Sequence, residues 1–223
     1  MANMNLVTGF AGTPHVTAED AGVLNAVILG PGQYVMNYGN KLKASVITNN
    51  LVRVLDGVVM MQGRQIRIAE NTNVELSIDN GSTGYNRNDL IVARYTKYAN
   101  SGIEEANLVV IKGTATTGEA ADPTYTSGNI FGGAVQNDMP LYRIPIEGIN
   151  AKEPVALFDV ASGFADAIVG VEQHMADKAN PHGVTPEQIG AAKSEHEHAY
   201  NEITGAPVFS YDANTGTLTI TKG

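Results

Sequence analysis

The last quarter of this chain consists of short elements that cannot form a hydrophobic core of their own. A heptad-patterned segment, Glu153 to Lys178, is followed by residues 180–190 (NPHGVTPEQIG), which are rich in turn and helix-start signals. Residues 209–220 then alternate apolar and polar side chains around the turn sequence ANTG, and predict a β-hairpin. An isolated hairpin is marginal in water. We therefore expect the apolar faces of these elements to meet other chains in an oligomeric rod.

The segment from Glu153 to Lys178 predicts one helix with an apolar seam, and Pro154 suits its first position. The seam residues are spaced 4-3-4-3-4, as in a coiled coil: Leu157, Ala161, Phe164, Ile168, Val171 and Met175. Gly163 and Gly170 lie inside the segment, and each costs up to about 1 kcal/mol relative to alanine. A lone helix would be marginal, so we expect self-association along the seam. Packing of the seam on the β-rich part of the same chain is the alternative.

Residues 34–146 show period-two alternation with frequent turn signals and little helix, which predicts a β-sandwich or small barrel. The apolar runs 58–61 and 108–111 predict strands that are buried on both faces. Four dipeptides predict turns: Asp56-Gly57, Gln62-Gly63, Asn80-Gly81 and Lys112-Gly113. Residues 114–138 predict a long loop before a last strand, 141–146.

One helix is expected ahead of this β-rich region. Thr17 can cap its N-terminus and Asp20 lies in its first turn, where the helix dipole favours an acid. Residues 30–32 (GPG) end it. Its apolar residues are Ala21, Leu24, Val27 and Ile28. We expect this helix to be a lid or interface element beside a sheet.

The composition excludes several classes of function. The 14 lysines and arginines against 23 acidic residues give a net charge of -9 without a basic cluster, so nucleic acid and anionic membrane are poor partners. The absence of cysteine excludes disulfides, thiolate catalysis and cysteine metal sites. Residues 1–10 have no basic leader, and no apolar run reaches the roughly 18 residues of a membrane helix. We expect synthesis in a cytosol, no recognisable export signal and no membrane insertion.

No catalytic arrangement stands out in the sequence. Ser77 and Ser82 have no histidine nearby, and neither a Gly-x-Ser-x-Gly nor a Gly-x-x-x-x-Gly-Lys motif occurs. The dipeptide Glu104-Glu105 is expected to be a solvated turn rather than an acid/base pair. We predict that the protein is not an enzyme.

The C-terminal motifs carry a resemblance to a known family. Residues 180–190 resemble the segment found between modules in many bacteriophage tail fibre proteins, and residues 196–207 (HEHAYNEITGAP) resemble the His-x-His fibre repeat that ends in Ile-Thr-Gly-x-Pro. The N-terminal part is similar to the leading domain of prophage baseplate and tail proteins from Gram-positive bacteria. That similarity rests on residues 16–20, 56–64, 87–92 and 138–143.

The resemblance implies a homotrimeric structural protein of a phage tail tip or baseplate, located in the virion and assembled in the host cytoplasm. Residues 1–152 would be the β-rich domain that attaches to other tail or baseplate proteins. Residues 153–179 would form a trimeric coiled-coil stalk, and residues 180–223 a short β-rich fibre tip. Large fibres of this family carry many more residues after this motif than the 16 that follow Pro207 here, so we expect no sizeable receptor-binding head. This favours an adaptor or a small tip.

His196 and His198 are the candidate metal ligands. They are separated by one residue, so in an extended segment both point to the same side. One chain supplies only two ligands, whereas a threefold axis supplies six imidazoles, which suits octahedral coordination of a transition metal such as iron, zinc or nickel. Exposed or intersubunit hydrogen-bonding histidines are the alternative. His174 and His182 flank the helix end and are expected to cap carbonyls or pack between chains, and His15 is expected to be structural.

Three functions compete. The leading hypothesis is a trimeric structural component of the virion tail. The second is a receptor-binding protein whose tip contacts cell-wall saccharide, for which Tyr200, Phe209 and Tyr211 are the nearby aromatic candidates. The third is a tail-associated glycan lyase or hydrolase, which would require paired carboxylates in a groove.

Overall fold

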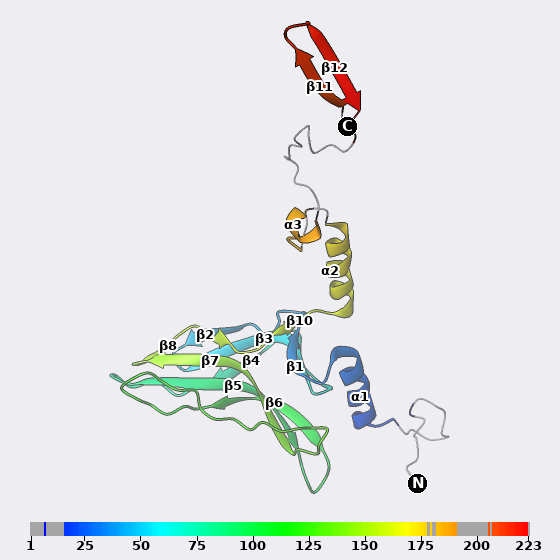
Figure 1. Ribbon diagram of the computed structural model, residues 1–223. Coiled ribbons are helices and arrows are strands. Elements are labelled where there is room, and N and C mark those ends of the chain that lie inside the picture. Colours follow the sequence, from blue (N-terminus) through cyan, green and yellow to red (C-terminus); the bar gives the residue numbers. More distant parts are fainter. Residues whose placement is uncertain are drawn as a thin grey trace. The chain divides into compact units, whose positions relative to one another are not determined.

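The computed structural model describes residues 7, 16–177, 179, 182–190, 205 and 207–222 (Figure 1). The protein is mainly β, which confirms the fold class expected from the period-two pattern. The chain divides into two compact units, Met1–Ala167 and Ile168–Gly223, which we call the N-terminal and C-terminal units. Among the described residues no helix combines the length and apolar character needed to cross a bilayer.

Helix α1 (Ala18–Leu29) begins with a capping box. The Asp20 amide donates to Thr17 Oγ1 at 3.1 Å, and the Thr17 amide donates in return to Asp20 Oδ2 at 2.9 Å. These two bonds satisfy amides that the first helical turn leaves without a partner. The helix ends before Gly30, whose φ of +89° suits glycine. Both helix boundaries were predicted from the sequence.

Two sheets follow, each of five strands. The first sheet contains β1 (Gln33–Met36), β2 (Ala44–Thr48), β3 (Leu51–Met61), β4 (Arg64–Ser77) and β10 (Val160–Ala161). Its order is β10-β1-β3-β2, with β4 also paired to β3. The second sheet contains β5 (Asn86–Lys97), β6 (Glu104–Ile111), β7 (Gln136–Glu147), β8 (Asn150–Ala151) and β9 (Val155–Ala156). Its order is β6-β5-β7-β8, with β9 also paired to β7.

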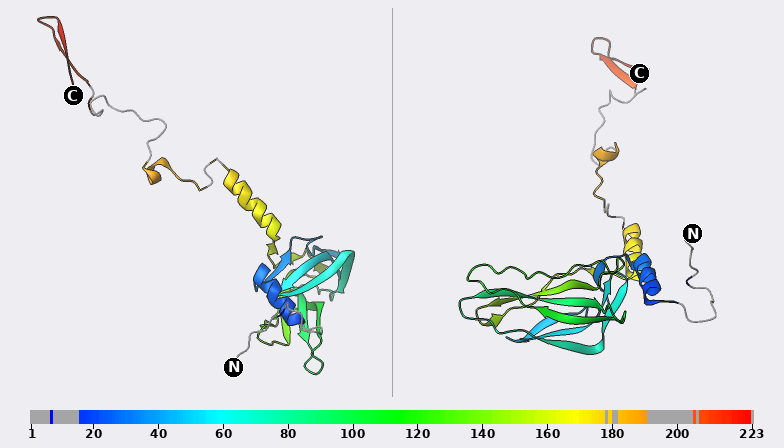
Figure 2. Two further views of the ribbon diagram at one scale, coloured as in Figure 1. Left: turned by 90° about the vertical axis from the view of Figure 1, so that its right-hand side faces the viewer. Right: turned by 90° about the horizontal axis from the view of Figure 1, so that it is seen from below.

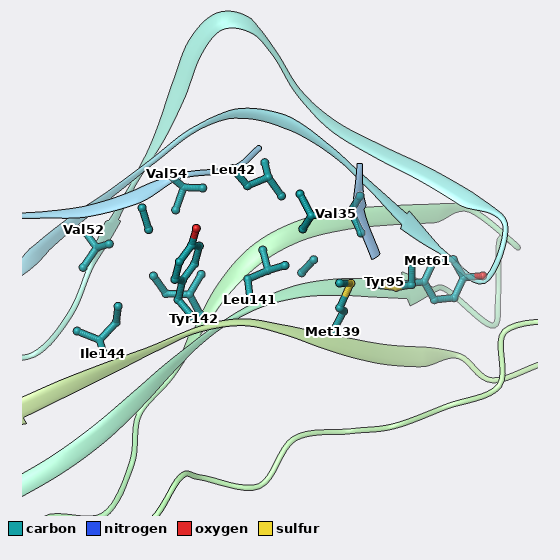
Figure 3. Close-up of a cluster of buried hydrophobic side chains, with 14 of the residues drawn as sticks. Val35, Leu42, Val52, Val54, Met61, Tyr95, Met139, Leu141, Tyr142 and Ile144 are labelled. Carbon is teal, nitrogen blue, oxygen red and sulfur yellow. The ribbon is translucent and has the colours of Figure 1, made fainter. Parts of the chain in front are cut away.

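The two sheets pack face to face on a shared core. Figure 2 shows them as two layers, the first sheet in blue and cyan and the second in green and yellow-green. Val52 and Val54 point from the first sheet toward Leu141 and Ile144 of the second (Figure 3), and all four side chains are fully buried. The described strands of the N-terminal unit form two separate sheets, so the arrangement is a two-layer sandwich rather than a closed barrel.

The expected turn at Asp56-Gly57 is a β-bulge inside β3, and this part of the prediction is wrong. The register of the β3–β4 pair shifts between Leu55 and Gly57. Asn40 Nδ2 donates to Asp56 Oδ1 at 2.6 Å, which lowers the pKa of this buried carboxyl group. A Cβ atom on Gly57 would lie 2.6 Å from the backbone nitrogen of Leu42. The glycine therefore serves a close backbone approach within a strand, which a local sequence pattern does not distinguish from a turn.

The predicted turn at Gln62-Gly63 is confirmed, because it joins β3 to β4 with positive φ at both residues. The run 58–61 is buried throughout, as expected. The run 108–111 is only half-buried, because it belongs to β6, which pairs with β5 alone and forms an edge of the second sheet.

The long loop between β6 and β7 (residues 112–135) was also expected, and buried carboxylates hold it to the second sheet. Asp89 is fully buried. It accepts hydrogen bonds from Arg87 Nε at 2.8 Å and from the Gly113 amide at 2.9 Å. The first residues of the loop are therefore fixed to β5 through a charge-assisted bond.

A second buried carboxylate repeats this arrangement further along the loop. Asp138 accepts from Arg94 Nε at 2.6 Å and from the Thr126 amide at 3.1 Å. Asp122, in the loop itself, accepts from Arg143 Nε at 2.6 Å, and these bonds lower the pKa of its carboxyl group. The polar residues of β5 and β7 thus position a segment that has little regular structure.

The predicted helix starting at Glu153 is wrong over residues 153–163. The chain instead forms β9 and β10, and helix α2 covers only Phe164–Ala176. Leu157 donates its amide to the carbonyl oxygen of Leu141 at 2.9 Å, and Ala161 lies in β10. These two residues of the expected seam therefore belong to the β-rich unit. This unit also extends beyond residue 152, where the sequence placed its boundary.

Open sheet edges explain why this segment is not helical. β9 pairs with β7, and β10 pairs in parallel with β1, where Val160 is opposite Val35. The Phe158 ring contacts Tyr142 edge-to-face, with 5.4 Å between ring centroids. Backbone pairing to two existing edges and this ring contact outweigh a helix propensity that β-branched valines already weaken. The heptad pattern contains no information about those edges.

The C-terminal unit contains three further elements: α3 (Pro186–Ile189), β11 (Pro207–Asp212) and β12 (Thr217–Lys222). α3 starts as predicted, because the Thr185 amide donates to Gln188 Oε1 at 2.8 Å and the Gln188 amide approaches Thr185 Oγ1 at 3.4 Å. β11 and β12 form the expected antiparallel hairpin.

We predict that a chain ending at Gly163 is more stable than one ending at Asn150. The shorter chain lacks β9, β10 and Phe158, so it loses two strand pairings and an aromatic pair. We expect its free energy of unfolding to be lower by about 2 kcal/mol or more. Urea denaturation followed by circular dichroism measures this, and Phe158→Ala in the longer chain isolates the ring. Equal stability of the two chains would contradict the assignment of β9 and β10 to the domain.

Candidate interaction surfaces

Helix α1 packs on the β3–β4 turn through its small and polar side. Gly22 is its buried residue, and a Cβ atom on Gly63 would lie 2.1 Å from the carbonyl oxygen of Gly22. Asn25 Nδ2 donates to the carbonyl oxygen of Gly63 at 2.9 Å. Two glycines thus let the helix backbone lie directly on the turn. The apolar side chains Leu24, Val27 and Ile28 are exposed and are not part of this contact.

The opposite side of α1 is apolar and exposed. Four large aliphatic side chains lie on it, at i, i+1, i+4 and i+5: Val23, Leu24, Val27 and Ile28. Val27 is 77% exposed. The apolar side of an amphipathic helix is normally the side that packs on another surface. We call these four residues the α1 face, and it has the character of an interface.

An ion pair between the sheets fixes the helix in place. Arg64 at the start of β4 donates from Nε and Nη2 to the two carboxylate oxygens of Glu104, at 2.7 and 2.9 Å. Arg64 Nη1 also lies 3.5 Å from the carbonyl oxygen of Ala18 in α1. The hydrogen bonds from Arg64 lower the pKa of Glu104, and the same contacts raise the pKa of Arg64. Glu104 and Glu105 begin strand β6, so the expected solvated turn at these residues is wrong, and Glu104 is held in an ion pair between the sheets.

The helical part of the predicted seam is exposed. Ile168, Val171 and Met175 follow one another on one side of α2, and Met175 is 73% exposed. The side chain of Phe164 lies outside the described residues. A Cβ atom on Gly170 would meet no atom within 4 Å. The stripe therefore has the coiled-coil spacing but no covering surface within the described chain.

The terminal hairpin has one apolar and one polar face. The opposed pairs Phe209–Ile220 and Tyr211–Leu218 lie on one face. The other face carries Ser210 opposite Thr219, Asp212 opposite Thr217 and Val208 opposite Thr221, so it is mainly polar. All twelve strand residues are exposed, and Tyr211 is 67% exposed. We call the face with Phe209, Tyr211, Leu218 and Ile220 the hairpin face.

The C-terminal unit holds no buried side chain among its described residues. Some of its apolar side chains form stripes on α2 and on the hairpin face, whereas others, such as Val169, Val184 and Ile189, are exposed outside them. Contiguous exposed apolar stripes of this kind are typical of surfaces that contact another protein.

Two of the predicted histidine positions can be located. His174 Nε2 lies 3.2 Å from His182 Nε2, and both side chains are exposed. His196 and His198, the candidate metal ligands, lie outside the described residues, as does His15. In the part of the chain that the structure describes, no three potential metal ligands form a group. Metal coordination by His196 and His198 stays a prediction.

Surface hollows adjoin the sheets. One of about 490 Å³ is lined by Pro31, Gln62, Ser127, Gly128, Asn129 and Phe131. Two others have different linings. One, of about 340 Å³, lies beside α1 and is lined by residues that include Asn25, Leu29 and Tyr38. The other, of about 380 Å³, is polar and is lined by Asn86, Asn88, Glu119, Ala120, Arg143, Pro145, Ile146 and Glu147. The lining residues of this polar hollow include no aromatic ring on which a sugar could stack. The prediction that the protein is not an enzyme remains a prediction.

We predict that Glu104→Gln lowers thermal stability at neutral pH and loses this effect in acid. The folded-state pKa of Glu104 lies below its unfolded value of about 4.3, so its stabilising contribution is complete above that value and is lost as the pH falls through the folded pKa. We expect a deficit of about 1 kcal/mol at pH 7. Thermal melts between pH 7 and 3 test this against the exposed control Glu119→Gln. A deficit that persists undiminished at pH 3 would exclude the ion pair as its cause.

The sequence matches no protein-family model and no curated protein.

Proposed function

We propose that this protein is a homotrimeric structural component of a phage tail tip or baseplate. Its N-terminal unit docks to other tail proteins, and its C-terminal part projects as a short fibre. The observation that carries the proposal is the exposure of every described side chain in the C-terminal unit, although apolar residues line one side of α2 and one face of the hairpin.

Self-association would cover the apolar side of α2 and the hairpin face at once. A two-stranded hairpin needs a third surface for stability in water. Three copies can direct the hairpin face toward a common axis while Ser210 and Thr219 remain in solvent. The same symmetry lets Ile168, Val171 and Met175 meet their counterparts in a short coiled coil. This stalk is shorter than the sequence suggested, because the segment before Phe164 belongs to the sheets.

The proposal that three chains associate rests on the resemblance of residues 180–190 and 196–207 to tail fibre proteins. In that family His196 and His198 would place six imidazoles on the axis around iron, zinc or nickel. The chemistry of that donor set fits a transition metal. Its contribution would be to hold three chains together beyond the stalk.

The α1 face supports docking by the N-terminal unit. The helix is pinned to the sandwich by its polar side and presents Leu24, Val27 and Ile28 outward. A rigid apolar surface of this kind suits a permanent protein contact, because it loses little conformational entropy on binding. The net charge of -9 makes nucleic acid and membrane poor alternatives.

The alternative is a receptor-binding protein that contacts cell-wall saccharide through its tip. Exposed aromatic side chains at Phe209 and Tyr211 favour it. However, both rings share the hairpin face with Leu218 and Ile220, so a trimer that buries this face leaves few aromatic rings for a sugar. We therefore favour the structural role.

We predict a trimer at micromolar concentration, which Ile168→Asp disrupts. The substitution places three unpaired carboxylates along the stalk axis, at a cost of several kcal/mol per ion. Light scattering coupled to gel filtration measures the mass. Gln173→Asp adds the same charge on the opposite side of α2 and should leave the trimer intact. A wild-type monomer would overturn the proposal.

A second matched pair of variants tests the hairpin face. Ile220→Asp should destabilise the trimer, whereas Thr219→Asp, one residue away on the polar face, should not. Equal effects of the two variants would mean that the hairpin face is not the one covered.

Deletion of residues 191–223 distinguishes the hypothesis of an adaptor from the hypothesis of a receptor-binding protein. If the protein is an adaptor, the truncated chain still assembles into tails, and isolated full-length protein does not bind purified host cell wall. Val27→Asp should abolish tail incorporation without altering the circular dichroism spectrum, and Glu19→Gln in the same helix is the control. Tight binding of the isolated protein to wall polysaccharide, lost on deletion, would reverse the choice.

A further inference from the structure

His174 and His182 bring two imidazole nitrogens to one point. His174 lies in the last turn of α2, and His182 follows eight residues later. Their Nε2 atoms are 3.2 Å apart, with 4.9 Å between ring centroids and 87° between ring planes. The two nitrogens thus face each other although the rings come from different parts of the chain.

A hydrogen bond alone explains this arrangement poorly. Both side chains are exposed, so water can satisfy each ring equally well. A neutral, solvated hydrogen bond adds only about 1 kcal/mol to stability, and bringing two side chains together has an entropic cost. Something that binds both nitrogens at once accounts for the convergence better.

The spacing of the two nitrogens suits a shared metal ion. Two nitrogens bound at about 2.0–2.1 Å to one ion lie about 3.3 Å apart at a tetrahedral angle and about 2.9 Å apart at a right angle. The observed 3.2 Å falls between these values. The separation of the two nitrogens is therefore compatible with one shared ion.

We propose that His174 and His182 of one chain chelate a transition-metal ion through their Nε2 atoms. Imidazole favours zinc, copper and nickel over magnesium and calcium. No third protein ligand joins the pair among the described residues, so water completes the coordination and the ion exchanges readily. The two rings must then carry their protons on Nδ1, which leaves Nε2 as the ligand.

A metal ion bound by both histidines would link the end of α2 to the segment that leads to α3. Binding links residues that are eight positions apart and so restricts the chain where the stalk helix has ended. The site lies within one chain and needs no threefold axis, unlike a site at His196 and His198. It is therefore independent of the proposed trimer.

The test uses full-length, tag-free protein carrying His196→Ala and His198→Ala, which removes the other candidate ligands. Titration with Zn²⁺ by calorimetry should give one ion per chain. Adding either His174→Ala or His182→Ala should weaken binding at least about tenfold, since each removes one of two protein ligands. Gln173→Ala, beside His174, should leave binding unchanged.

Electron paramagnetic resonance with Cu²⁺ gives a direct signature, because two imidazole nitrogens produce a different coupling pattern from one. Binding should weaken with falling pH, as protons and metal compete for the same nitrogens. Absence of Zn²⁺ binding in the His196→Ala/His198→Ala protein would overturn the proposal. Binding that neither His174→Ala nor His182→Ala changes would overturn it equally, and would leave a hydrogen-bonded pair.

Discussion

Apolar surface must be covered for a chain to fold in water, and this protein meets that requirement in two different ways. In the N-terminal unit the sheets cover each other: Val52 and Val54 of the first meet Leu141 and Ile144 of the second. Most of the remaining structure depends on that contact, because it fixes β5 and β7, whose buried carboxylates hold the long loop. In the C-terminal unit the described elements enclose no core and their apolar stripes are exposed. Under the proposed function, association with other chains covers these stripes.

Helix α1 also carries apolar side chains that need a covering surface, and these lie on the outside of the sandwich. Its contact with the sheets is made by glycine backbone and by the amide of Asn25, which leaves the aliphatic side chains outside. A helix used only to close a core would have the reverse orientation. The inverted orientation, together with the Arg64–Glu104 pair that links α1 to both sheets, favours a preformed docking element at this end of the chain.

Local signals predicted much of this fold. The capping box at Thr17, the turn at Gln62-Gly63, the long loop and the terminal hairpin all rest on residues close together in sequence, so their patterns are complete within a short window. The errors arise where distant partners decide the outcome. Gly57 is a bulge because Leu42 approaches its backbone, and residues 155–156 and 160–161 are strands because β7 and β1 have open edges. Neither partner is visible in the local pattern.

The histidines illustrate the same limit at a candidate site. His196 and His198 attract attention because one intervening residue places both on the same side of an extended chain. His174 and His182 have no such spacing, and the sequence indicated only caps or packing contacts for them. Their nitrogens meet because a helix ends between them. If both pairs bind metal, they stabilise different things. The first pair would hold three chains together, whereas the second would restrain a single chain before it joins the others. Metal dependence of chain mobility and metal dependence of trimer stability would then be separable properties of one protein.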